Sequence, residues 1–453
     1  MSSASLETPL VNQPIDPPRR PDTKFLLGDY SIYFADEANY FLDTGKVGPM
    51  VRFRLAHLDH LLVTDAEFAK EILQTRNKNY LKEPRLMKII ESGAAQTLFS
   101  SDGDEWIWRR RLMQPAFHKK QIAAFCDAIL NETEKMVDSW NAGEMHDMDE
   151  AMKMVTMMII GRTMFNVDMD GDSADLHWAY RTLSETLISR ITSPIQTPAW
   201  MPTKANRDFQ KCQEIITTTL SSIMNERRHA TEPQNDLLEM LLTMVDVEDG
   251  FTQEQMIFEM SSIVFAGHET TAATLAWILY VLTEHPDVEA KLLEEIDTVI
   301  GDRRPTMDDL EKLPYLNMVI NETLRMYPPA RATNRQAIEA DELGGYKVRA
   351  GEAVFINIEG IQKDERYWDN PLQFDPERWT AERSANRHKW AFLPFLDGPR
   401  KCIGEPLSRT EMQLILVTML KRFRFVLPAG AKVEKKVGFV LQPSGLEMIL
   451  EPR

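Results

Sequence analysis

The chain has 453 residues, of which 43% are hydrophobic and 27% are charged, an ordinary globular composition that excludes disordered and fibrous classes. Its formal net charge of −17 argues against nucleic acid as a partner. The three cysteines, an odd number without framework spacing, argue against a disulfide scaffold and are typical of a reducing, cytoplasmic location.

The N-terminal segment is polar and rich in proline, and it predicts an extended leader over residues 1–24 ahead of a single domain over residues 25–453. No basic segment followed by an apolar one opens the chain, so we expect no signal peptide. Unbroken apolar runs, such as residues 276–282, are far shorter than the ~20 residues that span a bilayer. We therefore expect no membrane anchor.

Hydrophobic periodicity predicts the elements in the first two thirds of the chain. Residues 50–55 and 61–64 alternate between apolar and polar and predict a pair of strands. Residues 65–325 have an almost entirely helical pattern, which a proline-rich loop interrupts at residues 193–202. The longest helix is expected over residues 252–284, and the proline that follows closes it.

The pattern changes after Pro328 and Pro329. Gly344 and Gly345 predict a turn, residues 346–358 predict strands, and residues 414–423 predict a return to helix. The sequence contains no internal repeats and no low-complexity tract. It therefore predicts a mainly α fold with a minor β region.

The strongest chemical signal is the segment F-L-D-G-P-R-K-C-I-G at residues 395–404, directly before a helix expected to begin near Leu407. A cysteine that ligates iron must hold its sulfur as a thiolate. Backbone N–H groups at a helix N-terminus and nearby cations stabilise that charge. Gly398 and Gly404 allow a tight turn and a close approach to a flat ring system. Cys402 is therefore the candidate iron ligand.

With this segment the chain resembles the cytochrome P-450 superfamily, from about Gly48 onward. The segment matches the family's FxxGxRxCxG haem loop without a substitution. The resemblance implies the cytochrome P-450 fold, with haem b between a long central helix and the cysteine loop. It makes Cys402 the axial ligand of the haem iron. The other haem-loop residues that it assigns to cofactor binding are Phe395, Gly398, Arg400 and Gly404.

A second signature is the pair Glu322 and Arg325, which lie three residues apart and so share one face of a helix. In the family such a pair is buried and is joined by the arginine of a PERF-like motif, here Arg378. Trp379 replaces the usual phenylalanine of that motif, and Gln362 replaces a common histidine. The resemblance implies that these residues are structural and hold the haem loop.

A third signature lies within the longest helix, at Ala266, Gly267, Glu269 and Thr270. Glycine and threonine are poor helix formers, and a threonine hydroxyl can bond the carbonyl four residues back, so a kink or a packing notch is one interpretation. In the family this segment forms a groove where dioxygen binds. The resemblance implies that Thr270 and Glu269 deliver protons and that Ala266 and Gly267 line the groove. The intervening His268 is not expected to be a ligand.

A fourth signature is Trp106 with Arg110, which matches the family's WxxxR pattern and implies contact with a haem propionate. Arg335 resembles the arginine that meets the other propionate. Alternatively, a solvated basic helix face explains Arg109 and Arg111. The resemblance also predicts a surface cluster of Arg109, Arg111, Lys119 and Lys401 that attracts an acidic redox partner.

The resemblance implies a haem monooxygenase that inserts one oxygen atom of dioxygen into a small apolar substrate, by hydroxylation or epoxidation. The chain ends thirty residues after Phe423, so we expect no fused reductase domain. Electrons from NAD(P)H would then arrive only indirectly, through an external ferredoxin, flavodoxin or flavoprotein reductase. We expect the substrate pocket to be formed by Tyr80–Leu98, Leu187–Trp200 and residues 330–332, where Arg331 could pair with a substrate carboxylate.

Three alternatives stay open at this point. A haem-thiolate peroxygenase would use hydrogen peroxide directly, but such proteins tend to lose the Glu269–Thr270 pair that is intact here. A haem-thiolate isomerase or dehydratase would show a disturbed haem loop. A non-catalytic haem-binding sensor or carrier would not need a proton-delivery pair, and NADPH consumption with a matched reductase would distinguish it.

Overall fold

The computed structural model describes residues 14–21, 23–24, 28–55, 57–91, 95–169, 173–193, 197–198, 200–229, 231–232, 234, 236–245 and 250–453. Its internal contacts divide the chain into two compact units, Met1–Glu83 with Ala332–Ile361 and Pro84–Arg331 with Gln362–Arg453. Most of the predicted leader, residues 1–13 and 22, lies outside the described residues. Ile15 and Arg19 form β-bridges with Tyr346 and Arg52 of the first unit.

The first unit is built on a five-stranded sheet in the order β1-β2-β8-β5-β3. Its elements are α1 (Tyr30–Ala35), α2 (Tyr40–Gly45), β1 (Met50–Leu55), β2 (Leu58–Val63), α3 (Ala66–Lys70), β3 (Tyr80–Leu81), β5 (Ala332–Ala337), β6 (Asp341–Leu343), β7 (Tyr346–Val348) and β8 (Ala353–Asn357). The strand predicted at residues 50–55 is confirmed. Its partner begins at Leu58, earlier than predicted, because the antiparallel pairing continues to Leu55 opposite Leu58.

The turn predicted at Gly344 and Gly345 joins β6 to β7. Both glycines adopt a positive φ, 55° and 84°, which residues with a Cβ rarely do. A Cβ at Gly344 would also collide with the ring of Phe68. The two glycines therefore let a tight hairpin turn close against α3.

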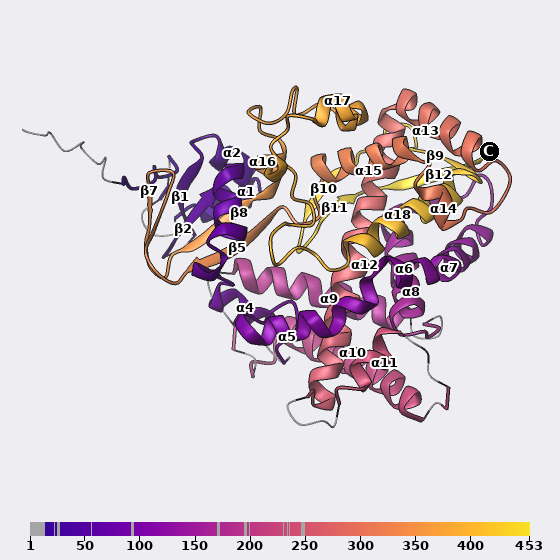
Figure 1. The fold of residues 1–453 in the computed structure, drawn as a ribbon, viewed down its shortest axis with the longest axis horizontal. Helices are drawn as coiled ribbons and strands as arrows, with labels where there is room; N and C mark the ends of the chain where they lie inside the picture. Colours follow the sequence, from indigo (N-terminus) through magenta and orange to yellow (C-terminus); the bar gives the residue numbers. More distant parts are fainter. Residues whose placement is uncertain are drawn as a thin grey trace, which may run out of the picture. The chain divides into compact units, whose positions relative to one another are not determined.

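The second unit is mainly helical (Figure 1). Its helices are α4 (Pro84–Ile90), α5 (Gly103–Met113), α6 (Lys119–Ala124), α7 (Cys126–Asp138), α8 (Met148–Met164), α9 (Ser173–Thr192), α10 (Lys204–His229), α11 (Leu237–Leu242), α12 (Gln253–Glu284), α13 (Pro286–Val299), α14 (Met307–Leu310), α15 (Pro314–Met326), α17 (Ala381–Ser384) and α18 (Glu405–Leu420), while α16 (Ile358–Gln362) lies where the two units join in sequence. Its strands form a sheet β4-β12-β9 and a hairpin β10-β11, with β4 (Met145–Asp147), β9 (Phe423–Val426), β10 (Glu434–Val437), β11 (Leu441–Ser444) and β12 (Glu447–Pro452). The predicted mainly α fold with a minor β region is confirmed.

The longest helix, α12, matches its prediction almost residue for residue. Thr252 caps it, because the Thr252 hydroxyl accepts from the N–H of Gln255 at 3.1 Å while the Gln255 side chain accepts from the N–H of Thr252 at 2.8 Å. The helix ends at Glu284, and α13 starts at the proline that follows. Figure 1 shows α12 running through the middle of the second unit beside α18.

The last helix was predicted less well, over residues 414–423. It runs over Glu405–Leu420, and the chain then forms β9, which begins at Phe423. The burial of β9 alternates, and the strand pairs with β12, so tertiary pairing overrides the apolar run that suggested helix.

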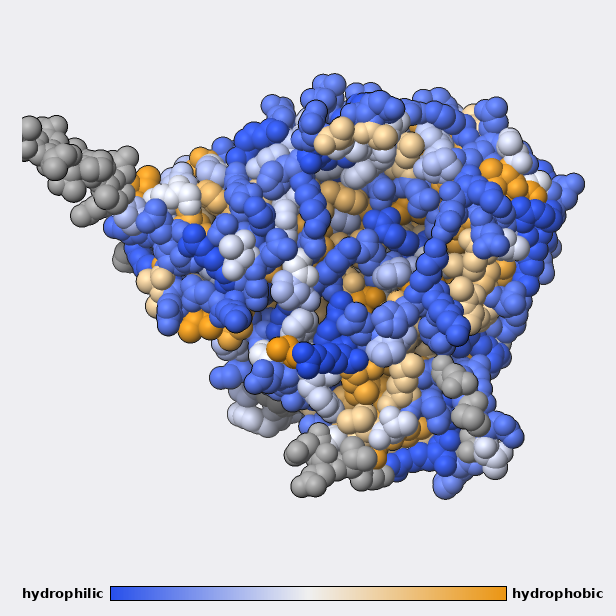
Figure 2. All heavy atoms as spheres, in the orientation of Figure 1, coloured by the Kyte–Doolittle hydropathy of each residue, from blue (hydrophilic) through white to orange (hydrophobic). Residues whose placement is uncertain are grey.

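On the face shown in Figure 2 the surface is mostly hydrophilic, with hydrophobic side chains in small groups.

No helix in the described ranges is both long enough and apolar enough to span a bilayer.

One buried carboxyl on α18 gives a stability prediction. Glu411 is 2% exposed, its Oε1 has no hydrogen-bond partner among the described residues, and burial raises its pKa well above the ordinary value. A raised folded-state pKa contributes stability that is complete below the unfolded-state pKa and is lost as pH rises through the folded one. We expect the unfolding free energy of the wild type to fall relative to that of Glu411→Gln as the pH rises from the unfolded-state pKa of glutamate toward neutrality, by up to about 1.4 kcal/mol per pH unit. Urea unfolding across this pH range measures it, and parallel pH curves for the two proteins would contradict the prediction.

Candidate active site

The loop around Cys402 is fixed by its own backbone. The N–H of Cys402 donates to the carbonyl of Phe395 at 2.9 Å, and the N–H of Lys401 donates to the carbonyl of Gly398 at 3.1 Å. Leu396 and Gly398 adopt positive φ values of 57° and 77°, so the turn needs the freedom of glycine at position 398. These contacts place Cys402 just before the N-terminus of α18.

The Cys402 sulfur lies where its charge is partly compensated. Burial raises the pKa of the thiol, while N–H groups of Gly404 and Glu405 and the guanidinium of Arg110 lower it. The carboxylate of Glu405 works against ionisation, but it is held by Lys401 at 2.7 Å and Arg409 at 3.0 Å. Two N–H donors at a helix start, with an arginine nearby, are the surroundings that a ligating thiolate requires.

Gly404 lies in the turn that leads into α18, as predicted. Its φ is −82°, which any residue can adopt, so the turn itself does not require glycine at this position. A Cβ at Gly404 would lie 3.9 Å from the Cys402 sulfur, with no other heavy atom of the described chain within 4 Å apart from its own neighbours. Glycine therefore keeps the space beside the sulfur free, and the Cys402 side chain is exposed to it.

Arg110 on α5 reaches the cysteine loop. Its Nη1 donates to the carbonyl of Lys401 at 2.9 Å, and burial lowers the pKa of its guanidinium. Arg110 therefore lies beside the cysteine loop, while its contact with a propionate stays a prediction. Arg110 is held by one neutral carbonyl, which leaves further N–H groups for an anionic group of a ligand.

Arg400 and Trp106 form a second contact between α5 and the loop. The guanidinium of Arg400 lies 4.3 Å from the centre of the Trp106 ring, and it donates to the carbonyl of Ser101 at 2.9 Å. It also pairs with the carboxylate of Asp102. Sequence reasoning missed Asp102, which gives Arg400 a partner within the chain and makes it a link between the loop and α5.

The predicted basic cluster is wrong for Arg109. That side chain is 1% exposed and pairs with the buried Glu259 on α12, and also with Glu105 at 2.6 Å. The helical repeat turns Arg109 inward, so it cannot belong to a surface patch. The predicted surface lysines are exposed but paired, Lys119 with Glu311 at 2.6 Å and Lys401 with Glu405.

Within α12, Thr270 hydrogen-bonds the carbonyl of Ala266 at 2.9 Å. Ala266 is exposed although most of this helix is buried. The next residue, Thr271, contacts Ser408 on the first turn of α18 at 3.0 Å. This contact brings the Ala266–Thr271 segment beside the helix whose start carries Cys402.

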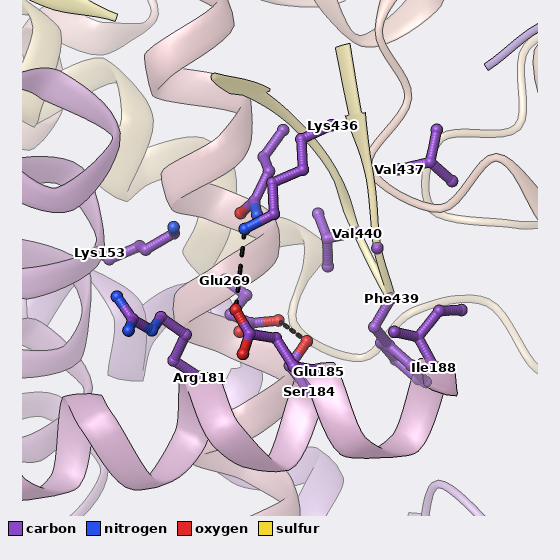
Figure 3. A pocket seen from close by; sticks show the side chains of 12 residues that line it. Lys153, Arg181, Ser184, Glu185, Ile188, Glu269, Lys436, Val437, Phe439 and Val440 are labelled. Carbon is purple, nitrogen blue, oxygen red and sulfur yellow. Dashed lines mark hydrogen bonds and ion pairs between the residues drawn. The ribbon is translucent and has the colours of Figure 1, made fainter. Parts of the chain in front are cut away.

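The carboxyl of Glu269 is buried, and its pKa differs from that of an exposed glutamate. The Ser184 hydroxyl on α9 donates to the Oε2 of Glu269 at 3.0 Å (Figure 3). Burial raises the pKa of Glu269 to about 7, although Ser184 and Lys153 oppose the shift. A carboxyl with such a pKa can both take up and release a proton at neutral pH.

Gly267 packs against the neighbouring helix α8, and the ring of His268 lies beside Tyr180 of α9. A Cβ on Gly267 would lie 2.7 Å from the terminal carbon of Ile160, so this glycine allows α12 to pack closely there. The packing-notch interpretation therefore has support at Gly267. The His268 ring contacts the carbonyl of Val264 at 3.0 Å, and burial lowers its pKa to about 4, which leaves it neutral.

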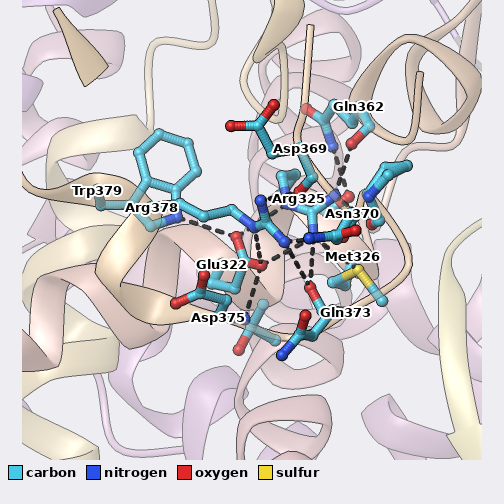
Figure 4. A network of polar contacts seen from close by, with 12 residues as sticks. Glu322, Arg325, Met326, Gln362, Asp369, Asn370, Gln373, Asp375, Arg378 and Trp379 are labelled. Atoms are coloured by element: carbon cyan, nitrogen blue, oxygen red, sulfur yellow. Dashed lines mark hydrogen bonds and ion pairs between the residues drawn. The ribbon is translucent and has the colours of Figure 1, made fainter. Parts of the chain in front are cut away.

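Glu322 is the centre of a buried polar network (Figure 4). Arg325 donates to both Glu322 oxygens at 2.8 Å, and Arg378 donates to Oε1 at 3.1 Å. The Trp379 ring N–H donates to Oε2 at 3.1 Å, a bond that a phenylalanine could not make. The N–H of Asp375 adds a further donor at 3.0 Å. The structure thus brings together all three predicted structural residues.

Gln362 ties this network to the segment ahead of the cysteine loop. Its amide nitrogen donates to the carbonyls of Leu324 and Arg325 at 3.0 and 3.1 Å. Its amide oxygen accepts from the N–H of Leu393 at 2.8 Å. Gln362, which stands where the family usually has histidine, therefore connects the network to this segment. The sequence alone did not reveal this role.

Arg335 lies on β5 of the first unit. It is buried and donates to the carbonyl of Asn334 at 2.6 Å and to the hydroxyl of Thr333 at 3.2 Å. Its role toward a propionate stays a prediction.

An aromatic cluster includes Phe99, directly after the predicted Tyr80–Leu98 wall in the chain, and its three residues fall outside the predicted walls. Phe439, between β10 and β11, lies 5.1 Å from Phe265 on α12 and 6.4 Å from Phe99, ring centre to ring centre. Phe439 was missed in the sequence, because nothing in the pattern brings residue 439 to α12. Residues 194–196 and 199 of the predicted wall lie outside the described residues, and Trp200 at its end is 81% exposed.

Comparison with known proteins identifies similar chains along almost the full length. The family model described as Cytochrome P450 matches residues 39–450. The chain is 30% identical over 447 residues to cyclooctat-9-en-7-ol 5-monooxygenase of Streptomyces melanosporofaciens, covering 96% of this chain and 97% of that protein.

Two further relatives and one solved structure are similar. Pentalenene oxygenase of Streptomyces avermitilis is 30% identical over 76% of this chain and 75% of its own. The chloroplastic protein LUTEIN DEFICIENT 5 of Arabidopsis thaliana is 32% identical over 85% of this chain and 68% of its own. The crystal structure of the cytochrome P450DA heme domain superposes with a TM-score of 0.87 at 24% identity, covering 97% of this chain and 98% of that one.

Proposed function

The chain belongs to the cytochrome P450 family of haem monooxygenases, and we propose that it inserts one atom of dioxygen into an apolar, unsaturated hydrocarbon substrate. The observation that carries this proposal is the surroundings of Cys402. Two backbone N–H groups, a helix start and Arg110 converge on one sulfur beside a space that Gly404 keeps free.

These residues fit haem b. Cys402 would be the axial ligand, and Gly404 would leave room for the flat ring beside the sulfur. Arg110 has N–H groups to spare for a propionate, with Trp106 beside the same loop and Arg335 proposed for the second propionate. When bound, haem would supply an iron able to activate dioxygen, and thiolate ligation by Cys402 would favour that chemistry.

The chain's own groups would handle the protons. Thr270 bonds the carbonyl of Ala266 within α12, so its hydroxyl is held on the exposed side of that helix. Glu269, with a pKa near 7, can replace a proton that Thr270 passes on. We propose Thr270 and Glu269 as the proton-delivering residues.

The substrate class is proposed from the aromatic cluster and from the relatives. Phe99, Phe265 and Phe439 form an apolar wall without a charged group among them. The names of two relatives specify an alkenol and an alkene, cyclooctat-9-en-7-ol and pentalenene. An unsaturated hydrocarbon skeleton matches both, because apolar area buried against aromatic rings supplies the binding free energy.

Electrons are proposed to come from a separate ferredoxin, flavodoxin or flavoprotein reductase, so that NAD(P)H acts only indirectly. We also propose that the protein works in the cytoplasm. Arg111 and Lys120 are exposed, and no carboxylate of the described chain pairs with them. They replace Arg109 in the proposed docking surface.

We therefore expect Arg111→Glu with Lys120→Glu to slow reduction by an acidic ferredoxin several-fold at low salt, because repulsion replaces attraction. Substrate affinity should be unchanged. Stopped-flow reduction at two ionic strengths measures the effect, which should shrink at high salt. Arg422→Glu, an exposed arginine paired with Asp138, is the control. Equal reduction rates in all three proteins would refute this docking surface.

The proposed function is tested by oxygen-isotope incorporation. The haem-loaded protein is supplied with a competent reductase, NADPH, pentalenene as probe and isotopically labelled dioxygen. We expect one labelled oxygen atom per product molecule. Product that carries oxygen from water, or turnover with hydrogen peroxide that exceeds the reductase-driven rate, would contradict a monooxygenase.

A further inference from the structure

A cavity of about 270 Å³ lies in the segment ahead of the cysteine loop, where residues 367–369 and 378–387 supply its lining. Arg378, one of the lining residues, belongs to the Glu322 network (Figure 4). Most of the lining is polar. Pockets that take drug-sized ligands hold roughly 300–1,000 Å³. This cavity therefore suits a small polar ligand.

Arg387 is the unusual cation of this cavity. Its guanidinium lies 4.2 Å from the centre of the Trp368 ring and 4.8 Å from the centre of the Trp379 ring. Its Nη2 donates to the carbonyl of Arg378 at 2.6 Å. No carboxylate of the described chain forms an ion pair with Arg387. The half-buried charge of Arg387 is thus left without a counter-ion.

The other arginines nearby do have counter-ions. Arg325 and Arg378 share Glu322, and Arg383 pairs with Asp375 at 2.8 Å. Burial lowers the pKa of Arg387 to about 10, and the positive charges of these three arginines lower it further, against the attraction of Glu322. Arg387 still carries its charge at neutral pH. An anion would therefore meet an uncompensated charge in partly desolvated surroundings, where charge-assisted hydrogen bonds are strong.

Trp368 gives a second, independent sign of a missing partner. Its side chain is 2% exposed and lines the cavity. The indole N–H is buried and has no hydrogen-bond partner among the described residues. Such donors are rare in native proteins, where buried N–H groups almost always meet an acceptor. Trp368 and Arg387 thus border one cavity as donors without an anionic partner.

Two carboxylates at the rim oppose an anion. Asp369 and Glu382 line the cavity, but both are exposed, so solvent and salt screen their charges. Arg387 is more buried and is screened less. Asn386 lies at the same rim, is also exposed, and carries no charge. The rim therefore weakens an anion site without cancelling it.

We propose that this cavity binds a small oxyanion of the phosphate class, held by the guanidinium of Arg387 and the indole N–H of Trp368, with Arg383 beside them. The planar fork of an arginine matches two oxygens of a phosphate, and the indole N–H is a donor for a third. Inorganic phosphate and the phosphate group of a small organic phosphate present the same oxygens. Occupancy should also stabilise the Glu322 network, because Arg387 donates to the carbonyl of Arg378.

The first test is a calorimetric titration of the haem-loaded protein with inorganic phosphate, in a zwitterionic buffer, against sodium chloride at equal ionic strength. We expect saturable binding of one phosphate per chain and none of chloride. Arg387→Gln should abolish binding, because it removes the charge. Lys389→Gln is the matched control, since Lys389 is an exposed cation of the same segment that pairs with Asp397 and does not line the cavity. Its affinity should equal that of the wild type.

Two rim variants keep the test sharp if Arg387→Gln does not fold. Asn386 and Glu382 are exposed and make no contact with the rest of the described chain that a change of charge would break. Asn386→Asp adds a carboxylate at the rim and should weaken phosphate binding several-fold. Glu382→Gln removes one and should strengthen it. Glycerol phosphate in place of inorganic phosphate distinguishes the source, because an organic phosphate should bind more tightly if it is the natural ligand.

The indole N–H of Trp368 is observed by nuclear magnetic resonance of protein with isotope-labelled tryptophan. Trp368→Phe identifies its resonance by loss. We expect this resonance to move downfield as phosphate is added, with the same midpoint as the calorimetric titration. The absence of saturable phosphate binding, equal binding of chloride, or unchanged affinity in both Arg387→Gln and Asn386→Asp would overturn the proposal. So would a Trp368 resonance that stays in place at saturating phosphate.

Discussion

Replacing Glu322 by glutamine should leave little protein that is both folded and able to bind haem. The Glu322 carboxylate is fully buried and accepts hydrogen bonds from Arg325, Arg378 and Trp379. Glutamine has the same shape but lacks the charge, so two buried guanidinium groups lose their counter-ion and an amide NH₂ group faces their donors. Breaking a buried charge pair in this way costs about 3–5 kcal/mol.

That loss is large against a typical unfolding free energy of about 5–15 kcal/mol. Urea unfolding and the amount of haem bound per purified chain measure it. Glu377→Gln is the matched control, because Glu377 belongs to the same segment but pairs with Lys291 at the surface. We expect the control to change stability by less than about 1 kcal/mol. A Glu322→Gln protein as stable as this control would show that the network does not hold the cysteine loop.

The second large effect concerns Thr270. Thr270→Ala should still bind haem and substrate and should still consume NADPH with a competent reductase. Product formed per NADPH should fall several-fold, while hydrogen peroxide rises by a matching amount. The reason is that the variant still accepts electrons from the reductase but lacks the hydroxyl that is proposed to pass protons on from Glu269.

Thr274→Ala is the control for this prediction. Thr274 lies one turn further along α12 and makes the same kind of bond, to the carbonyl of Thr270 at 3.0 Å. It tests whether loss of a backbone-bonded threonine hydroxyl alone disturbs the helix. Product and peroxide are measured together with NADPH consumption. Wild-type coupling in Thr270→Ala, or equal uncoupling in both variants, would contradict the role of Thr270.

The cysteine loop was predictable from sequence because its chemistry is local. Cys402, Gly398 and the start of α18 lie within a few residues of one another, so spacing alone brings a sulfur, a turn and a helix N-terminus together. The Glu322–Arg325 pair was predictable for the same reason, since both residues share one helical face. Its burial came from the family resemblance and is present in the structure.

The partners that the sequence did not reveal are distant along the chain. Arg109 lies in a run of three arginines, so the sequence suggested that it belongs to a solvated helix face. Its actual partner, Glu259, is 150 residues away along the chain. Asp102, Ser184 and Gln362 likewise act through contacts made by other elements. Periodicity specifies which face of a helix is buried, but it does not specify which charged group on another element meets that face.

The most direct measurement of the central claim is the absorption spectrum of the reduced, haem-loaded protein with carbon monoxide. Ligation by the Cys402 thiolate predicts a strongly red-shifted Soret band in the wild type and its loss in Cys402→Ala. Cys212→Ala, which removes a buried cysteine on α10, should keep the band. A wild-type band at the position typical of histidine ligation, in folded protein, would contradict the assignment of Cys402 as the iron ligand.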